Sequence, residues 1–198
     1  MNKETVSRFF RDPPELTTKR LVLRRLLKTD YRDMYEYACD QEVTRYLTWE
    51  AHPDPHYTLR YLSYIVPKYR SGEFHDWAVI SKETHKMIGT CGFTSFSYAH
   101  NSAEIGYVLN REYWGHGLAC EAIKAVMRIG FMELNLHRIE VKYMIENAQS
   151  RRVMEKCGMT FEGIQRESMY IKGNYKTIGV CAILTHEYMS LYQQPQNR

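Results

Sequence analysis

Two glycines stand where the sequence changes from strand-like to helix-like. The apolar segment 103–109 is followed by Gly115-His116-Gly117, and a helical pattern begins at Leu118. The N–H groups in the first turn of a helix have no partner inside the helix, and the helix dipole adds partial positive charge there. Such a loop can hold a phosphate or pyrophosphate. The same glycine pair is also what a tight strand-to-helix turn requires.

The loop departs from two common nucleotide-binding patterns. No Gly-Lys-Ser/Thr follows the glycines, so the loop is not a P-loop. A dinucleotide-binding fingerprint would have a third glycine where Cys120 stands, and it would follow a strand of a βαβ unit. A nucleotide-binding protein is therefore a minor alternative, and it would bind ATP more tightly than coenzyme A.

A second group of polar residues opens a later helix. Asn147 is a favourable N-cap residue for a helix over 147–157, and Ser150 lies one turn further on. Gly158 follows as a suitable helix stop. Capping alone would explain Asn147, and capping is compatible with contact to a ligand.

A glutamate on the strand before the glycine loop is a candidate general base. Strand alternation places Glu104 and Gly106 on one face of the strand, with Ile105 and Tyr107 on the other. A carboxylate close to a reacting amine can accept its proton. A glutamate that simply faces solvent is the competing interpretation.

These residues are positioned by a mixed α/β order of elements, β-α-α-β-β-β-α-β-α-β-β. The segments around 77–80, 86–93 and 103–109 predict an antiparallel meander. Further strands are expected at 20–24, 138–144, 159–162, 168–171 and 179–184, and helices at 30–39, 55–66, 118–129 and 147–157. The first 14 residues, ending in Pro13-Pro14, are expected to lead into the domain without joining its core.

The composition is that of one globular domain. The chain has 198 residues, of which 44% are hydrophobic and 25% charged, and a net charge of +4 that does not indicate a nucleic-acid partner. The five cysteines and eight histidines lack metal-ligand spacing, so reduced thiols, a cytoplasmic location and no metal are expected. No apolar stretch reaches the roughly 18 residues of a membrane span, so no membrane partner is expected.

Both motifs resemble those of the GNAT acetyltransferases. The pyrophosphate loop of that family reads Q/R-x-x-G-x-G/A, and segment 112–117 matches its glycines, with Glu112 in the first position and Arg111 beside it. The run 113–122 is most similar to the ribosomal-protein-alanine acetyltransferases (RimJ/RimL type). Segment 147–159 has every fixed position of that branch's N-x-x-S-x-x-V-x-x-x-x-G-F/M pattern.

The resemblance extends over roughly residues 16 to 190 and implies a fold and a cosubstrate. It implies a mostly antiparallel twisted sheet of about seven strands with about four helices. The GNAT domain would span 16–190, with an extension at 1–15 and a polar tail at 191–198. Acetyl-CoA would insert where strands 103–109 and 138–144 splay apart. The cofactor-binding residues would be Val108, Leu109, Arg111, Gly115, His116, Gly117, Leu118, Ala119, Asn147 and Ser150.

The implied reaction is direct attack of an amine on the thioester in a ternary complex. Glu104 would act as the base or as a charge that orients the substrate. Many members donate to the leaving thiolate from a tyrosine seven residues after the asparagine, but this chain has Met154 there, so Ser150 is the nearest matching hydroxyl. The N–H of Val108 would polarise the thioester carbonyl.

The acceptor is not specified by the resemblance. Tyr46 and Trp49 would face Tyr170 across a substrate cleft with Glu104, although these aromatic residues are equally typical of core or rim positions. A cleft open at both ends would favour a protein N-terminus as the acceptor, and a closed acidic pocket would favour a small amine. A coenzyme A-binding module without turnover is a third possibility. Members of the family often form homodimers.

Overall fold

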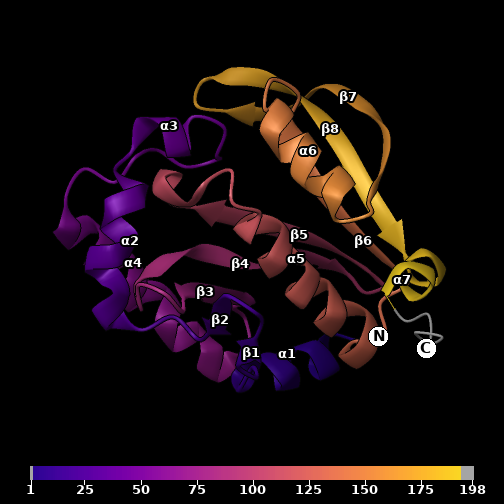
Figure 1. The fold of residues 1–198 in the computed structure, drawn as a ribbon, viewed down its shortest axis with the longest axis horizontal. Coiled ribbons are helices and arrows are strands. Elements are labelled where there is room, and N and C mark those ends of the chain that lie inside the picture. The colour runs from indigo at the N-terminus through magenta and orange to yellow at the C-terminus, as the bar shows by residue number, and fades with distance from the viewer. Residues whose placement is uncertain (1, 193–198) are drawn as a thin grey trace.

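The computed structural model describes residues 2–192, which form one mixed α/β domain around an eight-stranded sheet (Figure 1). The expected fold class is confirmed. One strand pair, β5 with β6, is parallel, and the other neighbours are antiparallel. Across the sheet the strands are β1 (Leu16–Thr17), β2 (Leu21–Arg24), β3 (Asp76–Ser81), β4 (Met87–Ser97), β5 (Ser102–Leu109), β6 (Arg138–Met144), β8 (Asn174–Leu184) and β7 (Thr160–Ile171).

Helices cover both faces of the sheet, so the domain has two apolar layers. One layer contains the inward side chains of α1 (Lys3–Arg11), α5 (Leu118–Arg128), α6 (Ala148–Lys156) and α7 (Thr185–Tyr192). The other contains those of α2 (Tyr31–Ala38), α3 (Gln41–Thr44) and α4 (Pro55–Ile65). Short 3-10 segments, η1 (Lys28–Asp30), η2 (Val66–Ser71) and η3 (Arg111–Tyr113), and the π-helical turn η4 (Ile129–Glu133) complete the chain.

Local sequence signals account for the ends of α4. The side chain of Asp54 accepts a hydrogen bond from the backbone N–H of Tyr57, and Pro55 occupies the first helical position. After Ile65 the chain tightens into η2, and Gly72 ends it in the left-handed conformation (φ 70°). The sequence predicted this start, this narrowing and this stop.

The N-terminal segment is part of the core, contrary to the expectation that it lies outside. Val6 and Phe10 of α1 are fully buried in the layer formed with α5. The ring of Phe10 lies 5.3 Å from that of Trp77, whose Nε1 donates to the carbonyl of Pro14. The error arose because charged residues dominate the segment while its few apolar residues share one helical face. We propose that the domain begins at α1.

The last hairpin is longer than expected. The segments 159–162 and 168–171 belong to one strand, β7, which pairs with β8 through two register irregularities. These irregularities hide the alternation in the sequence, because they place polar residues at successive positions. Of the expected tail, residues 191 and 192 end α7, and residues 193–198 lie outside the described part of the chain.

Candidate active site

The two central strands separate partway along their length. Strands β5 and β6 pair only from Ser102 to Glu104 and from Arg138 to Glu140. Beyond this vertex, the segments 105–109 and 141–144 face one another without sheet pairing. Their facing backbone groups are therefore available to an inserted ligand.

The register of β4 and β5 identifies which N–H groups face this gap. The N–H of Asn110 donates to the carbonyl of Ile88 at 2.7 Å, and antiparallel pairs alternate between hydrogen-bonded and non-hydrogen-bonded. Thr90 and Val108, two residues further along, therefore form a hydrogen-bonded pair. The N–H of Val108 points to β4 and is not free for a thioester carbonyl, which corrects the expectation from sequence. The N–H groups of Tyr107 and Leu109 point to the gap.

The glycine loop has the backbone shape expected of an anion cradle. Gly115 (φ 82°) and Gly117 (φ 76°) are left-handed, and both are exposed at the start of α5. Arg20 of the segment before β2 fixes the loop: its Nη1 donates to the carbonyl of His116 at 2.8 Å, and it forms an ion pair with Glu121 at 2.7 Å. The loop therefore offers backbone donors from a braced position.

Three other residues expected to bind acetyl-CoA, Arg111, Leu118 and Ala119, differ in the groups that they expose to a ligand. The guanidinium of Arg111 forms an ion pair with Asp40 at 3.1 Å and remains largely exposed. The side chain of Leu118 is buried in the core, and Ala119 packs against that core. Leu118 and Ala119 can thus contribute backbone N–H groups at the helix start but not side chains.

On the α5 side of the gap, three polar side chains meet at the start of α6. The side chain of Asn147 accepts from the N–H of Ser150 at 3.1 Å, as expected of a cap. The hydroxyl of Tyr107 donates to Oγ of Ser150 at 3.2 Å. Burial raises the pKa of Tyr107 to about 12. Met154 is fully buried, so the hydroxyls here belong to Ser150 and Tyr107. Tyr107 was not among the residues predicted from the sequence, because its contact with Ser150 joins positions 43 residues apart.

Glu104 lies at the vertex of the gap, on the opposite face of the sheet from Tyr107. Its carboxylate forms an ion pair with Lys142 of β6 at 2.9 Å, and Lys142 also contacts Glu140 at 3.1 Å. Burial lowers the pKa of Lys142, but its hydrogen bonds and charge interactions with these two glutamates outweigh burial and raise it. Glu104 is thus a paired carboxylate, held beside Lys142 at the vertex.

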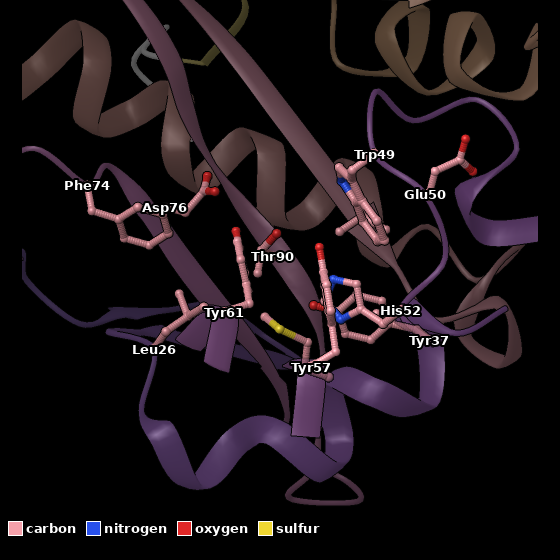
Figure 2. A pocket seen from close by; sticks show the side chains of 13 residues that line it. Leu26, Tyr37, Trp49, Glu50, His52, Tyr57, Tyr61, Phe74, Asp76 and Thr90 are labelled. Atoms are coloured by element: carbon pink, nitrogen blue, oxygen red, sulfur yellow. The ribbon is translucent and has the colours of Figure 1, made fainter. Parts of the chain in front are cut away.

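A pocket of about 220 Å³ opens on the same face, between the sheet and helices α2 and α4 (Figure 2). Aromatic side chains from four segments surround it, and Thr90 of β4 and Val108 of β5 contribute from the sheet. The lining residues are Leu26, Met34, Tyr37, Ala38, Trp49, Glu50, His52, Tyr57, Tyr61, Phe74, Asp76, Thr90 and Val108.

Asp76 is the charged group nearest the sheet in this pocket. Figure 2 shows its carboxylate close to the hydroxyl ends of Tyr61 and Thr90. Burial raises the pKa of Asp76 to about 7. Among the described residues, no donor or cation pairs with this carboxylate. An unpaired carboxylate in an apolar site is energetically costly, which is typical of a functional group.

The expected acceptor residues are only partly brought together. Trp49 lines the pocket. Tyr46 instead packs against Met144, Ile171 and Ile178, and neither it nor Glu104 is among the lining residues.

Tyr170 does not face Trp49 across a cleft, contrary to expectation. It is 66% exposed and contacts Tyr175 at 5.0 Å between ring centroids. Strand alternation explains this position, because its neighbour Ile171 takes the inward place.

The described residues, 2–192, offer neither a metal-binding cluster nor a membrane-spanning helix. Within them, no cluster of three or more His, Cys, Asp or Glu side chains is arranged to hold a metal ion. Over the same residues, no helix combines the length and apolar character needed to cross a bilayer.

Comparison with known proteins connects this geometry to a family. Residues 20–160 match the family model of the acetyltransferase (GNAT) domain. An uncharacterized N-acetyltransferase, p20, of Bacillus licheniformis is 34% identical over 173 residues, which cover 87% of this chain and 97% of the relative. A GNAT-family acetyltransferase structure from Bacillus anthracis has a TM-score of 0.78 and 28% identity over 87% of this chain and 99% of its own.

Two further solved structures share the fold and differ in their acceptors. Spermidine N-acetyltransferase from Vibrio cholerae, in complex with CoA and spermine, has a TM-score of 0.72 at 24% identity, covering 87% of this chain and 99% of its own. RimL, a ribosomal L7/L12 alpha-N-protein acetyltransferase in complex with coenzyme A, has a TM-score of 0.73 at 18% identity, covering 86% and 98%. At these identities the two structures support the fold alone.

Proposed function

Because this chain belongs to the GNAT acetyltransferase family, with acetyl-CoA as its cosubstrate, we propose that its acceptor is the primary amine of a small cationic molecule. The observation that carries this proposal is the aromatic pocket with the unpaired carboxylate of Asp76. A protein N-terminus, which the sequence pattern of the branch favours, is the alternative acceptor.

The residues present fit acetyl-CoA on the α5 side of the sheet. The exposed, left-handed Gly115 and Gly117 leave backbone donors open for the pyrophosphate at the start of α5. The gap between β5 and β6 would take the pantetheine arm, with Asn147 and Ser150 beside it. Acetyl-CoA supplies an acetyl thioester, which the uncharged form of an amine attacks.

The acceptor would enter from the opposite face. The pocket there is enclosed by α2, by α4 and by the loop that carries Trp49 and His52. Burial lowers the pKa of His52, so this imidazole is neutral at pH 7 and does not repel an ammonium group. Ammonium groups are attracted to aromatic faces and to carboxylates, and both line this pocket. A peptide would need a groove that continues past the pocket for its following residues.

Groups on both faces of the sheet would take part in acetyl transfer. The N–H of Tyr107 or Leu109 would stabilise charge on the thioester oxygen. Ser150, which accepts from Tyr107, would turn its own hydroxyl proton toward the leaving sulfur. Glu104, at the vertex on the acceptor face, would receive the amine proton through water, with Lys142 holding it in place.

The test is release of free coenzyme A with time from acetyl-CoA, measured against small amines and against peptides beginning with Ala or Ser. The proposal expects turnover with small amines and at least tenfold lower kcat/KM with the peptides. Turnover confined to peptides would instead establish the protein N-terminus as the acceptor. Tight acetyl-CoA binding without turnover on either panel would contradict both and favour the non-catalytic module.

Replacing Glu104 with Gln is expected to lower kcat by about 100-fold, the low end for a general base, because the carboxylate also pairs with Lys142. The loss should shrink as pH rises and more of the amine is uncharged. The pH profile of kcat, measured with a small amine, checks this. Glu140→Gln is the matched control, since Glu140 contacts the same lysine. Equal losses in both variants at every pH would assign Glu104 a structural role.

A further inference from the structure

We propose that the aromatic pocket holds a second ammonium group of the acceptor, so that the preferred substrates are aliphatic diamines and longer polyamines without a carboxylate. This inference rests on the proposed function and adds the residue that selects the substrate, Asp76. In this arrangement the reacting nitrogen lies at the gap between β5 and β6, and the second nitrogen lies against Asp76.

The first support is that no charged partner of Asp76 is found within residues 2–192. The ionisable groups of this face that interact with it are Tyr37 of α2, Tyr61 of α4 and Tyr69 of η2. Burial raises the pKa of each of these three tyrosines, so all of them are uncharged at neutral pH. None supplies a positive charge, and a cationic ligand would do so.

The second support is the make-up of the pocket wall. Tyr37, Trp49, Tyr57, Tyr61 and Phe74 provide aromatic faces, and no lysine or arginine is among the lining residues. Cations bind over such rings most strongly where water is excluded. The wall therefore suits an ammonium group with an aliphatic chain attached.

The third support is the distance from Asp76 to the gap. Asp76, Gly92 and Gly106 are in register on β3, β4 and β5. Oδ1 of Asp76 occupies the space that a Cβ on Gly92 would take, so the carboxylate lies over β4. With strands about 4.8 Å apart, this carboxylate is about 7–10 Å from the gap beyond β5.

This distance makes Asp76 a poor direct base and a suitable anchor. A hydrogen bond from an ammonium to the carboxylate takes up about 3 Å, which leaves about 4–7 Å between the two nitrogens, the span of about two to five methylene groups. Direct proton transfer would require contact at hydrogen-bond distance.

The pocket also discriminates against amino acids that carry two amines. Asp76 is the unpaired carboxylate of the lining, since Glu50 forms an ion pair with Lys172. No lysine or arginine among the lining residues could pair with the carboxylate of lysine or ornithine. Repulsion between like charges in a partly enclosed site would weaken their binding.

The experiment compares kcat/KM for butylamine, 1,3-diaminopropane, 1,4-diaminobutane, 1,5-diaminopentane and lysine, measured by coenzyme A release. With the wild-type enzyme, the best diamine should exceed butylamine by on the order of 100-fold, and lysine should resemble butylamine or be poorer. In Asp76→Asn, which keeps the side-chain shape, the ratio of diamine to butylamine should fall to near one. Glu50→Gln is the matched control, because the Glu50 side chain is 77% exposed and already pairs with Lys172 at 3.6 Å, so this change should alter the ratio only a few-fold.

The outcomes separate the inference from the function on which it rests. A wild-type ratio near one, or a ratio that survives in Asp76→Asn, would overturn the second-ammonium site while leaving a small-amine acetyltransferase. Lysine acetylated as well as the diamines would overturn the exclusion of carboxylates. If no amine in the series is turned over, the proposed function fails and the inference fails with it.

Discussion

At pH 8, Asp76→Asn is expected to unfold with a free energy about 2–4 kcal/mol larger than that of the wild-type protein. Burial raises the pKa of Asp76 to about 7, against 3.8 for the unperturbed group, a difference of about three pKa units. The folded protein therefore has to hold a charge that it disfavours. The asparagine amide removes this charge and keeps the shape of the side chain, so the folded state becomes more stable relative to the unfolded state.

The sign of the pH dependence follows from proton binding. Between about pH 4 and 7 the folded state binds more protons at Asp76 than the unfolded state does. The contribution of Asp76 to the stability of the wild-type protein should therefore fall with rising pH through this window and then level off. The advantage of the variant should accordingly be small at pH 4.5 and full at pH 8.

Urea unfolding of both proteins at the two pH values measures this difference, and titration of other groups cancels between them. Asp54→Asn is the control, since asparagine caps a helix about as well as aspartate and Asp54 caps α4. A destabilised Asp76→Asn, or an advantage that does not grow with pH, would contradict the burial argument. A more stable but less selective variant would fit a carboxylate retained for binding at the expense of stability.

Residues that act through local backbone geometry could be predicted from the sequence. The glycine loop and Asn147 are signalled by neighbours within a few residues, because turns and helix caps are local structures. The meander was likewise predicted, since short polar turns connect its strands.

Residues that act through tertiary contacts could not be predicted in this way. The environment of Asp76 is assembled from α2, α4, η2 and β4, which are far apart in the sequence. The pairing of Glu104 with Lys142 depends on the parallel register of β5 and β6. The N–H of Val108 is used in pairing with β4, which depends on how hydrogen-bonded pairs alternate along β4 and β5. One helical pattern in the sequence does indicate part of the pocket. Tyr57 and Tyr61 are four residues apart on α4, and this spacing places both rings on the pocket side of the helix.

The N-terminal helix provides the second large effect. Phe10→Ala is expected to lower the free energy of unfolding by about 3–5 kcal/mol, because it leaves a cavity among aromatic rings. Phe10 is 0% exposed, and its ring centroid lies 4.7 Å from that of His75, 5.3 Å from that of Trp77 and 6.2 Å from that of Phe93. Urea unfolding at low temperature measures the loss. Phe9→Ala is the control, since Phe9 is only partly buried and should cost much less.

The same substitution should impair binding in the acceptor pocket more than binding in the acetyl-CoA site. Phe10 packs against His75 and Trp77, the two neighbours of Asp76, from the opposite face of the sheet. Loosening this part of β3 should therefore raise KM for the amine more than KM for acetyl-CoA, whose expected contacts lie on β5, α5 and α6. Phe10→Leu, a milder change, tests this effect without the risk of unfolding. If Phe10→Ala and Phe9→Ala cost the same stability, or if the acetyl-CoA KM rises first, α1 would be an appendage to the domain rather than support for its substrate site.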